Sequence, residues 1–145
     1  ETAGRIKTII EREQPNAIYI DGIGVGAGVV DRLKEQGVDV RSVNVGLPAW
    51  DTDKFANKRA ELFWAIREAI EREELDLDPL DDVLSSQITK IRYSLTSAGK
   101  ILLEAKAKMG KSPDRADALS LTFAHTGADV VQISDAGLRI SPWSV

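Results

Sequence analysis

The sequence predicts an α/β protein built around parallel strands. Short apolar segments alternate with longer amphipathic ones, and the first two apolar segments are joined through a single helical segment. Such a strand–helix–strand unit is right-handed and places its two strands parallel to each other. A second pair of apolar segments flanks Ser97-Ala98-Gly99, which is typical of a hairpin turn.

The first part of the chain is predicted to contain a helix, a strand, a second helix and a second strand. An amphipathic helix covers residues 3–13, and AIYI at 17–20 forms a short buried strand. The second helix covers 28–37 and ends at its terminal glycine, and 38–45 forms the second strand. The helical positions expected to face inward are Ile6, Ile9, Ile10, Val29, Val30 and Leu33.

The clearest helical pattern covers residues 51–73, which carry apolar side chains at helical spacing. Asp51 or Asp53 is expected to cap its first turn. The inward positions are Phe55, Leu62, Phe63, Ile66 and Ile70.

Three further elements are predicted downstream. A short helix covers 83–90, and 91–107 forms a hairpin. A last helix follows Ser112-Pro113, covers 114–127 and ends at a glycine. Its expected buried residues are Ala118, Leu119, Leu121, Thr122 and Phe123. We expect one domain over residues 1–127, and residues 128–145 form a tail that packs on it or frays from it.

The composition narrows the class of chemistry. The chain has 145 residues with 43% hydrophobic and 29% charged side chains, as in globular domains, and shows no candidate membrane span. It has no cysteine and a single histidine, which excludes zinc fingers, thiol catalysis and histidine-rich metal sites. Metal chemistry would therefore use carboxylate oxygens, which favour Mg²⁺ or Mn²⁺.

The glycine-rich stretch AIYIDGIGVGAG first suggests nucleotide binding. Gly22, Gly24 and Ala27 have the spacing of a dinucleotide site between a strand and a helix. Asp21 would lie beside the pyrophosphate, however, and the next strand ends in VNVG without a ribose-binding acid. Residues 105–113, AKAKMGKSP, end like a phosphate-binding loop but lack its first glycine. Nucleotide binding therefore remains a distant alternative, which a titration with dinucleotides would settle.

Three acids form the stronger candidate site. Asp21 ends a parallel strand, where open α/β sheets place functional residues. Asp114 and Asp117 share one face of the last helix, and apolar neighbours of Asp117 direct it toward packed protein. A divalent metal shared with Asp21 would offset the cost of burying this carboxylate. In the alternative interpretation, Asp21 caps a turn and Asp114 stabilises the helix start.

Basic residues near this helix are candidates for phosphate contact, although the net charge is −4. The first group consists of Lys106, Lys108, Lys111 and Arg115. A second pair is Lys58 and Arg59, which an exposed helix face would explain equally well.

Four blocks of the chain, in order, resemble one known family. They are IYIDGIGVGAGVVDRLKEQG, NKRAELFWAIREAIEREEL, SAGKILLEAK and SPDRADALSLTFA, between about residues 4 and 126. Together they resemble the C-terminal nuclease domain of the large terminase subunit of tailed bacteriophages. The resemblance implies a ribonuclease H-like mixed sheet flanked by helices. It also implies metal-dependent endonucleolytic cutting of concatemeric DNA during genome packaging.

The resemblance also assigns the acids. Asp21 and Asp117 match two of the acids that hold two metal ions in this family, and Asp114 matches an accessory position. The ions, Mg²⁺ or Mn²⁺ about 4 Å apart, polarise the scissile phosphate and activate water. The glycines after Asp21 would give the DNA backbone room to approach. The family's first acid lies on a β-meander expected upstream of Glu1, so this chain alone is expected to cut weakly or not at all.

The implied partners are double-stranded DNA, the portal protein, the small terminase subunit and the ATPase domain of the same polypeptide. The implied location is the host cytoplasm during phage assembly, without membrane contact. The main alternative is a non-catalytic module that docks to DNA or to the portal protein.

Overall fold

The computed structural model describes residues 1–106, 110 and 112–124. The chain divides into an N-terminal unit, Glu1–Val45, and a C-terminal unit, Gly46–Val145, which are described separately below. The prediction of one domain over 1–127 stays a prediction, and the predicted tail, 128–145, lies outside the described residues. In the part of the chain that the structure describes, no helix is long and apolar enough to cross a membrane.

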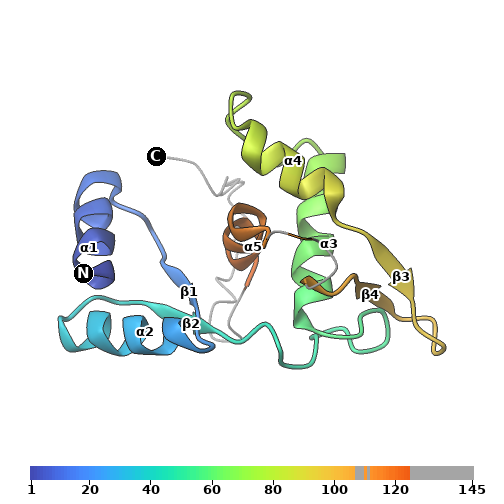
Figure 1. Ribbon diagram of the computed structural model, residues 1–145, viewed down its shortest axis with the longest axis horizontal. Coiled ribbons are helices and arrows are strands. Elements are labelled where there is room, and N and C mark those ends of the chain that lie inside the picture. Colours follow the sequence, from blue (N-terminus) through green and yellow to red (C-terminus); the bar gives the residue numbers. More distant parts are fainter. Residues whose placement is uncertain (107–109, 111, 125–145) are drawn as a thin grey trace, which may run out of the picture. The chain divides into compact units, whose positions relative to one another are not determined.

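The N-terminal unit has the predicted order of helix, strand, helix and strand (Figure 1). These elements are α1 (Thr2–Glu13), β1 (Tyr19–Asp21), α2 (Val25–Glu35) and β2 (Arg41–Val43). The two strands pair in parallel, with Ile20 opposite Ser42, which confirms the predicted crossover.

A small apolar core lies beneath α2 in this unit. Val30, Leu33 and Val40 are buried, and Ile6 and Ile20 pack against them while partly exposed. The inward face of α2 is therefore as predicted. Two expectations were wrong: Ile9 is 50% exposed, and no residue of β1 is fully buried.

Glycines are required after β1 by the packing and backbone conformation of the N-terminal unit itself. Helix α2 begins at Val25, three residues earlier than predicted, and Gly24 precedes it with φ +63°. A side chain at Gly26 would come within 1.8 Å of the Asp21 carbonyl oxygen, and one at Gly22 within 2.0 Å of Ser42 Oγ. The turn after Asp21 thus needs glycine for close packing and for a positive φ.

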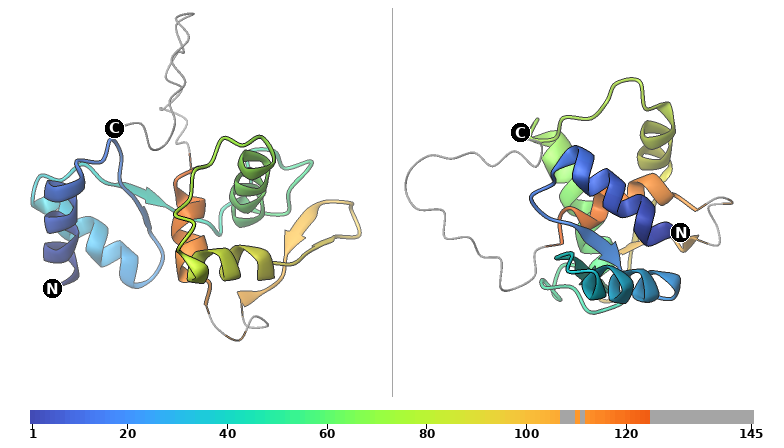
Figure 2. Two further views of the ribbon diagram at one scale, coloured as in Figure 1. Left: turned by 90° about the horizontal axis from the view of Figure 1, so that it is seen from above. Right: turned by 90° about the vertical axis from the view of Figure 1, so that its left-hand side faces the viewer.

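The C-terminal unit contains three helices and one hairpin among its described residues. They are α3 (Lys58–Glu71), α4 (Asp82–Lys90), β3 (Tyr93–Leu95), β4 (Ile101–Leu103) and α5 (Asp114–Leu121). Strands β3 and β4 pair antiparallel around the predicted turn, where Gly99 has φ +76°. Figure 2 shows α4 and α5 next to each other within this unit, and the two helices are in contact.

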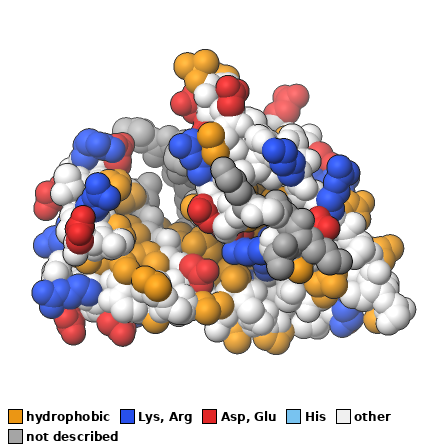
Figure 3. Space-filling view, in the orientation of Figure 1, with side chains coloured by type: hydrophobic (Ala, Val, Ile, Leu, Met, Phe, Trp, Pro, Cys, Tyr) orange, Lys and Arg blue, Asp and Glu red, His pale blue; other side chains and the backbone are white. Residues whose placement is uncertain are grey.

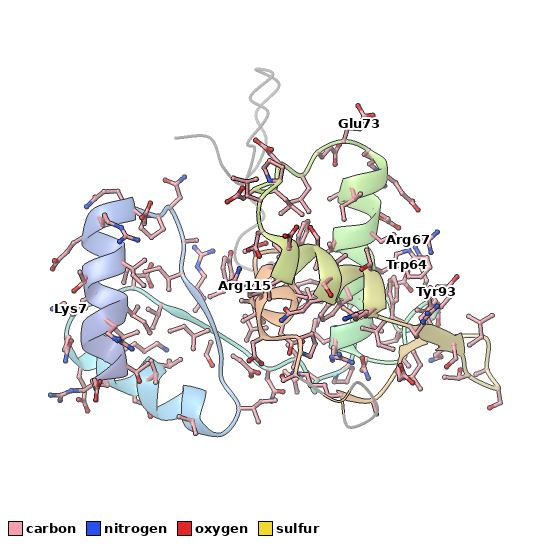
Figure 4. The ribbon with its side chains drawn as sticks, turned by 45° about the horizontal axis from the view of Figure 1, so that its top comes forward. Lys7, Trp64, Arg67, Glu73, Tyr93 and Arg115 are labelled. Atoms are coloured by element: carbon pink, nitrogen blue, oxygen red, sulfur yellow. The ribbon has the colours of Figure 1, made fainter. Side chains whose placement is uncertain are left out.

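The core of this unit forms where α3, β4 and α5 meet. Its buried residues are Ala49, Phe55, Ala60, Phe63, Ile66, Ile101, Leu103, Ala116 and Leu119. On the outer side of α3, Trp64 lies between Arg67 and Tyr93 (Figure 4). The Tyr93 ring meets the Trp64 ring edge-on, with centroids 5.2 Å apart.

The start of α3 differs from the prediction. Neither Asp51 nor Asp53 caps it, because the helix begins after Asn57, whose side chain accepts a hydrogen bond from Ala60 N. Asp51 instead accepts from the N–H groups of Asp53 and Lys54 in a preceding turn.

Some burial predictions for these helices were also wrong. Phe55 is buried, but it lies before α3, bridged to Ile101. Ile70 is 43% exposed. Helix α5 ends at Leu121, well before residue 127. Within and just after α5, Ala118 and Thr122 are exposed and Ala116 is buried, because Ala116 rather than Ala118 lies on the side that faces the core.

Candidate metal centre

Asp117 lies on the first turns of α5, and its side chain is 23% exposed. Lys106 Nζ lies 2.5 Å from Asp117 Oδ2, and Arg59 Nε lies 3.9 Å from Oδ1. Lys106 follows β4, and Arg59 belongs to the first turn of α3. The sequence predicted that a partly buried carboxylate here needs a positive partner, and two side-chain cations meet that need.

Arg59 is an interior cation. Its side chain is 14% exposed, and its Nη1 donates a hydrogen bond of 3.1 Å to the Glu104 carbonyl oxygen. The buried Nε and Nη2 atoms have no hydrogen-bond acceptor among the described residues. Burial lowers the pKa of Arg59, and the negative charge of Asp117 opposes this shift. The alternative prediction, that Arg59 lies on an exposed helix face, is therefore wrong.

Lys58 is also buried, at 7% exposure. Its Nζ lies 3.0 Å from Glu61 Oε2 and 3.1 Å from the centroid of the Trp50 ring. Glu61 additionally accepts hydrogen bonds from the N–H groups of Trp50 and Asp51, at 2.9 and 2.8 Å. Lys58 thus fastens the segment before α3 to the helix, and its burial argues against contact with DNA.

The beginning of α5 is held from α4. Gln87 Oε1 accepts hydrogen bonds from Arg115 N at 2.9 Å and Ala116 N at 3.0 Å. Arg115 Nη1 lies 2.5 Å from Asp81 Oδ1, so this arginine is paired within the unit. The Leu84 N–H and Arg115 both lower the pKa of Asp81. Sequence reasoning missed Gln87, because no local spacing connects residue 87 with a helix that begins at 114.

The other two acids lie where the sequence placed them. Asp114 is the first, exposed residue of α5. Asp21 ends β1 and is partly buried, and its Oδ1 accepts a hydrogen bond of 3.1 Å from Ile23 N. The alternative interpretation, in which Asp21 caps a turn, is therefore correct for this hydrogen bond. It does not exclude Asp21 as a metal ligand.

The donor chemistry suits a hard divalent cation. Asp21, Asp114 and Asp117 offer only carboxylate oxygens, the ligands that Mg²⁺ and Mn²⁺ prefer. Among the residues that the structure describes, no three or more His, Cys, Asp or Glu side chains form a group that could hold a metal ion. Asp21 belongs to the N-terminal unit and Asp117 to the C-terminal unit. An ion shared between them stays a prediction.

The structure describes only part of the first group of basic residues, Lys106, Lys108, Lys111 and Arg115. Lys106 is 41% exposed, whereas Lys108 and Lys111 lie outside the described residues. Within the units drawn in Figure 3, described Lys and Arg side chains are interspersed with Asp and Glu side chains.

Comparison with known proteins shows the fold. Three solved structures each cover 86% of this chain and 71% of their own, with a TM-score of 0.69. One is the nuclease domain of the large terminase subunit gp2 of bacterial virus Sf6, at 21% sequence identity. The others, at 22% identity, are lysine-to-alanine variants of the same subunit, one with manganese and β-thujaplicinol and one with calcium.

These matches confirm the predicted fold, ribonuclease H-like α/β, shared with terminase nuclease domains. No family model matches the chain, and no curated protein matches it.

Proposed function

We propose that this chain is part of the metal-dependent endonuclease domain of a phage DNA-packaging terminase, and that the complete domain cuts concatemeric DNA. Asp117 carries the proposal. It is a partly buried carboxylate on a helix of a terminase nuclease fold, and two cations lie against it. A partly buried carboxylate with positive side chains around it is common at functional sites.

The residues of this chain would divide the work as follows. Asp21 and Asp117, with Asp114 in an accessory position, would supply oxygen ligands to Mg²⁺ or Mn²⁺. When bound, a pair of such ions polarises the scissile phosphate and activates water. Arg59 places a positive charge 3.9 Å from Asp117 Oδ1, which offsets part of the cost of burying this carboxylate.

Lys106 is the best placed residue for a phosphate contact, since its side chain is long and 41% exposed. Lys108 and Lys111 extend the same segment. We leave Lys58 and Arg59 out of the DNA surface because their side chains are largely buried. Arg115 stays a candidate, since its side chain is 56% exposed although it is paired with Asp81. The partners would be double-stranded DNA and the packaging machinery in the host cytoplasm: the portal protein, the small subunit and the ATPase domain.

A non-catalytic DNA- or portal-docking module remains the second candidate. It is favoured by the pairing of Asp117 with Lys106 and Arg59, which gives this carboxylate positive partners without a metal ion. By the resemblance, a further acid comes from a β-meander upstream of Glu1, so cutting is tested on a chain extended through that segment.

The experiment has two parts. Isothermal titration of the 145-residue chain with Mn²⁺ should show weak binding that Asp21→Asn and Asp117→Asn both abolish. The extended chain should cut plasmid DNA with Mn²⁺ and little sequence preference, and the same substitutions should abolish cutting while DNA binding persists. Full cutting by either Asn variant would reject that acid as a metal ligand of the nuclease, and no cutting by the unsubstituted extended chain would favour the docking module.

A further inference from the structure

Helix α5 does not cap its own beginning. Its N-cap position is Pro113, a fully buried residue that makes no side-chain cap hydrogen bond. The first N–H groups of any helix have no partner within the helix and need acceptors from elsewhere. The nearest residues in sequence do not supply one, so the acceptor must come from another element.

Gln87 of α4 is that acceptor. Its Oε1 takes hydrogen bonds from both Arg115 N and Ala116 N, at 2.9 and 3.0 Å. A side-chain oxygen that accepts from two successive N–H groups fixes both the position and the direction of the helix start. Gln87 therefore does for α5 what a local N-cap residue does in other helices.

A second contact fixes the rotation of α5 about its axis. Arg115 Nη1 is held by Asp81 Oδ1, and Asp81 also caps α4 through Leu84 N. Positions two apart on an α-helix point about 200° away from each other. With Arg115 held against α4, Asp117 is directed to the opposite side, where Arg59 and Lys106 meet its carboxylate.

From these contacts we propose that Gln87 is a positioning residue for Asp117. Its amide oxygen holds the first turn of α5 so that the Asp117 carboxylate faces Arg59 and Lys106. The consequence for metal binding rests on the proposed function, since it assumes that the same carboxylate is a metal ligand. A residue that only capped the helix would stabilise the unit but would not affect what Asp117 contacts.

The test compares three substitutions in the 145-residue chain. Gln87→Met keeps the length of the side chain and removes the acceptor. Gln87→Glu keeps an acceptor oxygen. Thr96→Val is the matched control, because it removes the hydroxyl that accepts a hydrogen bond of 3.1 Å from Lys100 N in the β3–β4 turn, away from α5.

The first readout needs no metal. In each background (unsubstituted, Gln87→Met, Gln87→Glu and Thr96→Val), we measure the melting temperatures of Lys106→Met, Asp117→Asn and the double variant. The difference between the effect of the double variant and the sum of the two single effects measures the coupling between Lys106 and Asp117. We expect the coupling to fall toward zero with Gln87→Met and to persist with Gln87→Glu and Thr96→Val. Equal coupling in all backgrounds would overturn the proposal and leave Gln87 as a cap. If Gln87→Met does not fold, Gln87→Asn, which withdraws the acceptor by one methylene, replaces it.

The second readout is the affinity for Mn²⁺ alone, measured by titration calorimetry. We expect Gln87→Met to weaken it several-fold and Thr96→Val to leave it unchanged. Unchanged Mn²⁺ affinity in Gln87→Met would count against positioning while the proposed function stands. If the unsubstituted chain binds no Mn²⁺ but its ion-pair coupling still depends on Gln87, the proposed function fails and the positioning role stands.

Discussion

Lys106 Nζ lies 2.5 Å from Asp117 Oδ2, so this carboxylate oxygen is paired with a side chain that is 41% exposed. The second oxygen of Asp117 faces Arg59, whose side chain is only 14% exposed. An exposed lysine can leave at small cost, whereas a buried arginine cannot. A divalent ion that binds Asp117 is therefore expected to displace Lys106 rather than Arg59.

Replacing Lys106 with Met should raise the affinity for Mn²⁺, because the ion no longer competes with the lysine for Oδ2. A partly exposed ion pair is worth about 0.2–1 kcal/mol, which corresponds to a gain of up to about five-fold. Titration calorimetry measures this gain, with Lys90→Met as the control that removes an equal charge from the exposed end of α4. A loss of Mn²⁺ affinity in Lys106→Met alone would contradict the competition.

Asp117→Asn should destabilise the C-terminal unit, because it leaves Arg59 buried without a carboxylate beside it. The expected loss is on the order of 2 kcal/mol in the free energy of unfolding, measured by urea denaturation. Combining it with Arg59→Met should recover part of this loss, since the buried charge is removed along with its partner. Additive losses in the double variant would mean that the two side chains do not interact.

Periodicity and turn residues predicted most of the fold. The 3.6-residue pattern of Val30 and Leu33 identified α2, and Gly99 identified the hairpin. What failed depends on contacts between distant segments. Asn57 rather than Asp51 caps α3, because the residues before the helix are fixed by Glu61 and by the bridge between Phe55 and Ile101.

The candidate site shows the same limit. The apolar neighbours of Asp117 correctly indicated that its carboxylate needs a cation, but local sequence could not identify Arg59, which is 58 positions away. It also could not show that Lys58, the residue before Arg59, is committed to Glu61. Charge and helical spacing alone do not separate a cation that faces solvent from one held in the interior.

Gly26 and Gly28 should respond differently to alanine, although both lie in the first turns of α2. A Cβ at Gly26 would come within 1.8 Å of the Asp21 carbonyl oxygen, whereas one at Gly28 meets nothing within 4 Å. Gly26→Ala should therefore destabilise the unit by about 1–3 kcal/mol. Gly28→Ala should stabilise it by about 0.5–1 kcal/mol, because alanine is the better helix former. Thermal unfolding of both variants checks this, and equal effects would show that the turn after Asp21 is not tightly packed.

Stability should fall on acidification partly through Glu61. Burial alone would raise the pKa of Glu61, but hydrogen bonds from the N–H groups of Asp51 and Trp50, with Lys58, hold it below its usual value. A carboxylate whose pKa is lower in the folded state stabilises the fold above its unfolded pKa, about 4.3. That stabilisation is lost as the pH falls through the lower, folded value. Glu61→Gln should lower the melting temperature at pH 7 and flatten its decline below about pH 4.5. An unchanged decline would place the acid sensitivity elsewhere.

The segment that carries Lys106, Lys108 and Lys111 should account for much of the salt dependence of DNA binding. Each lysine that neutralises a phosphate contributes about 0.9 to the slope of log affinity against log salt concentration. Replacing all three with Ala should lower the slope accordingly, measured by fluorescence anisotropy with duplex DNA over a range of salt concentrations.

Two controls separate contact from net charge in that experiment. Removing the exposed Lys34 and Lys90 lowers the net charge by two at positions outside this segment and should change the slope little. Lys58→Met also removes a positive charge, but Lys58 is 7% exposed and paired with Glu61, so the slope should again be retained. A slope that follows the number of charges removed, wherever they lie, would mean that the segment only adds to the overall field. A slope that falls only when Lys106, Lys108 and Lys111 are replaced would place the DNA backbone beside the lysine that holds Asp117.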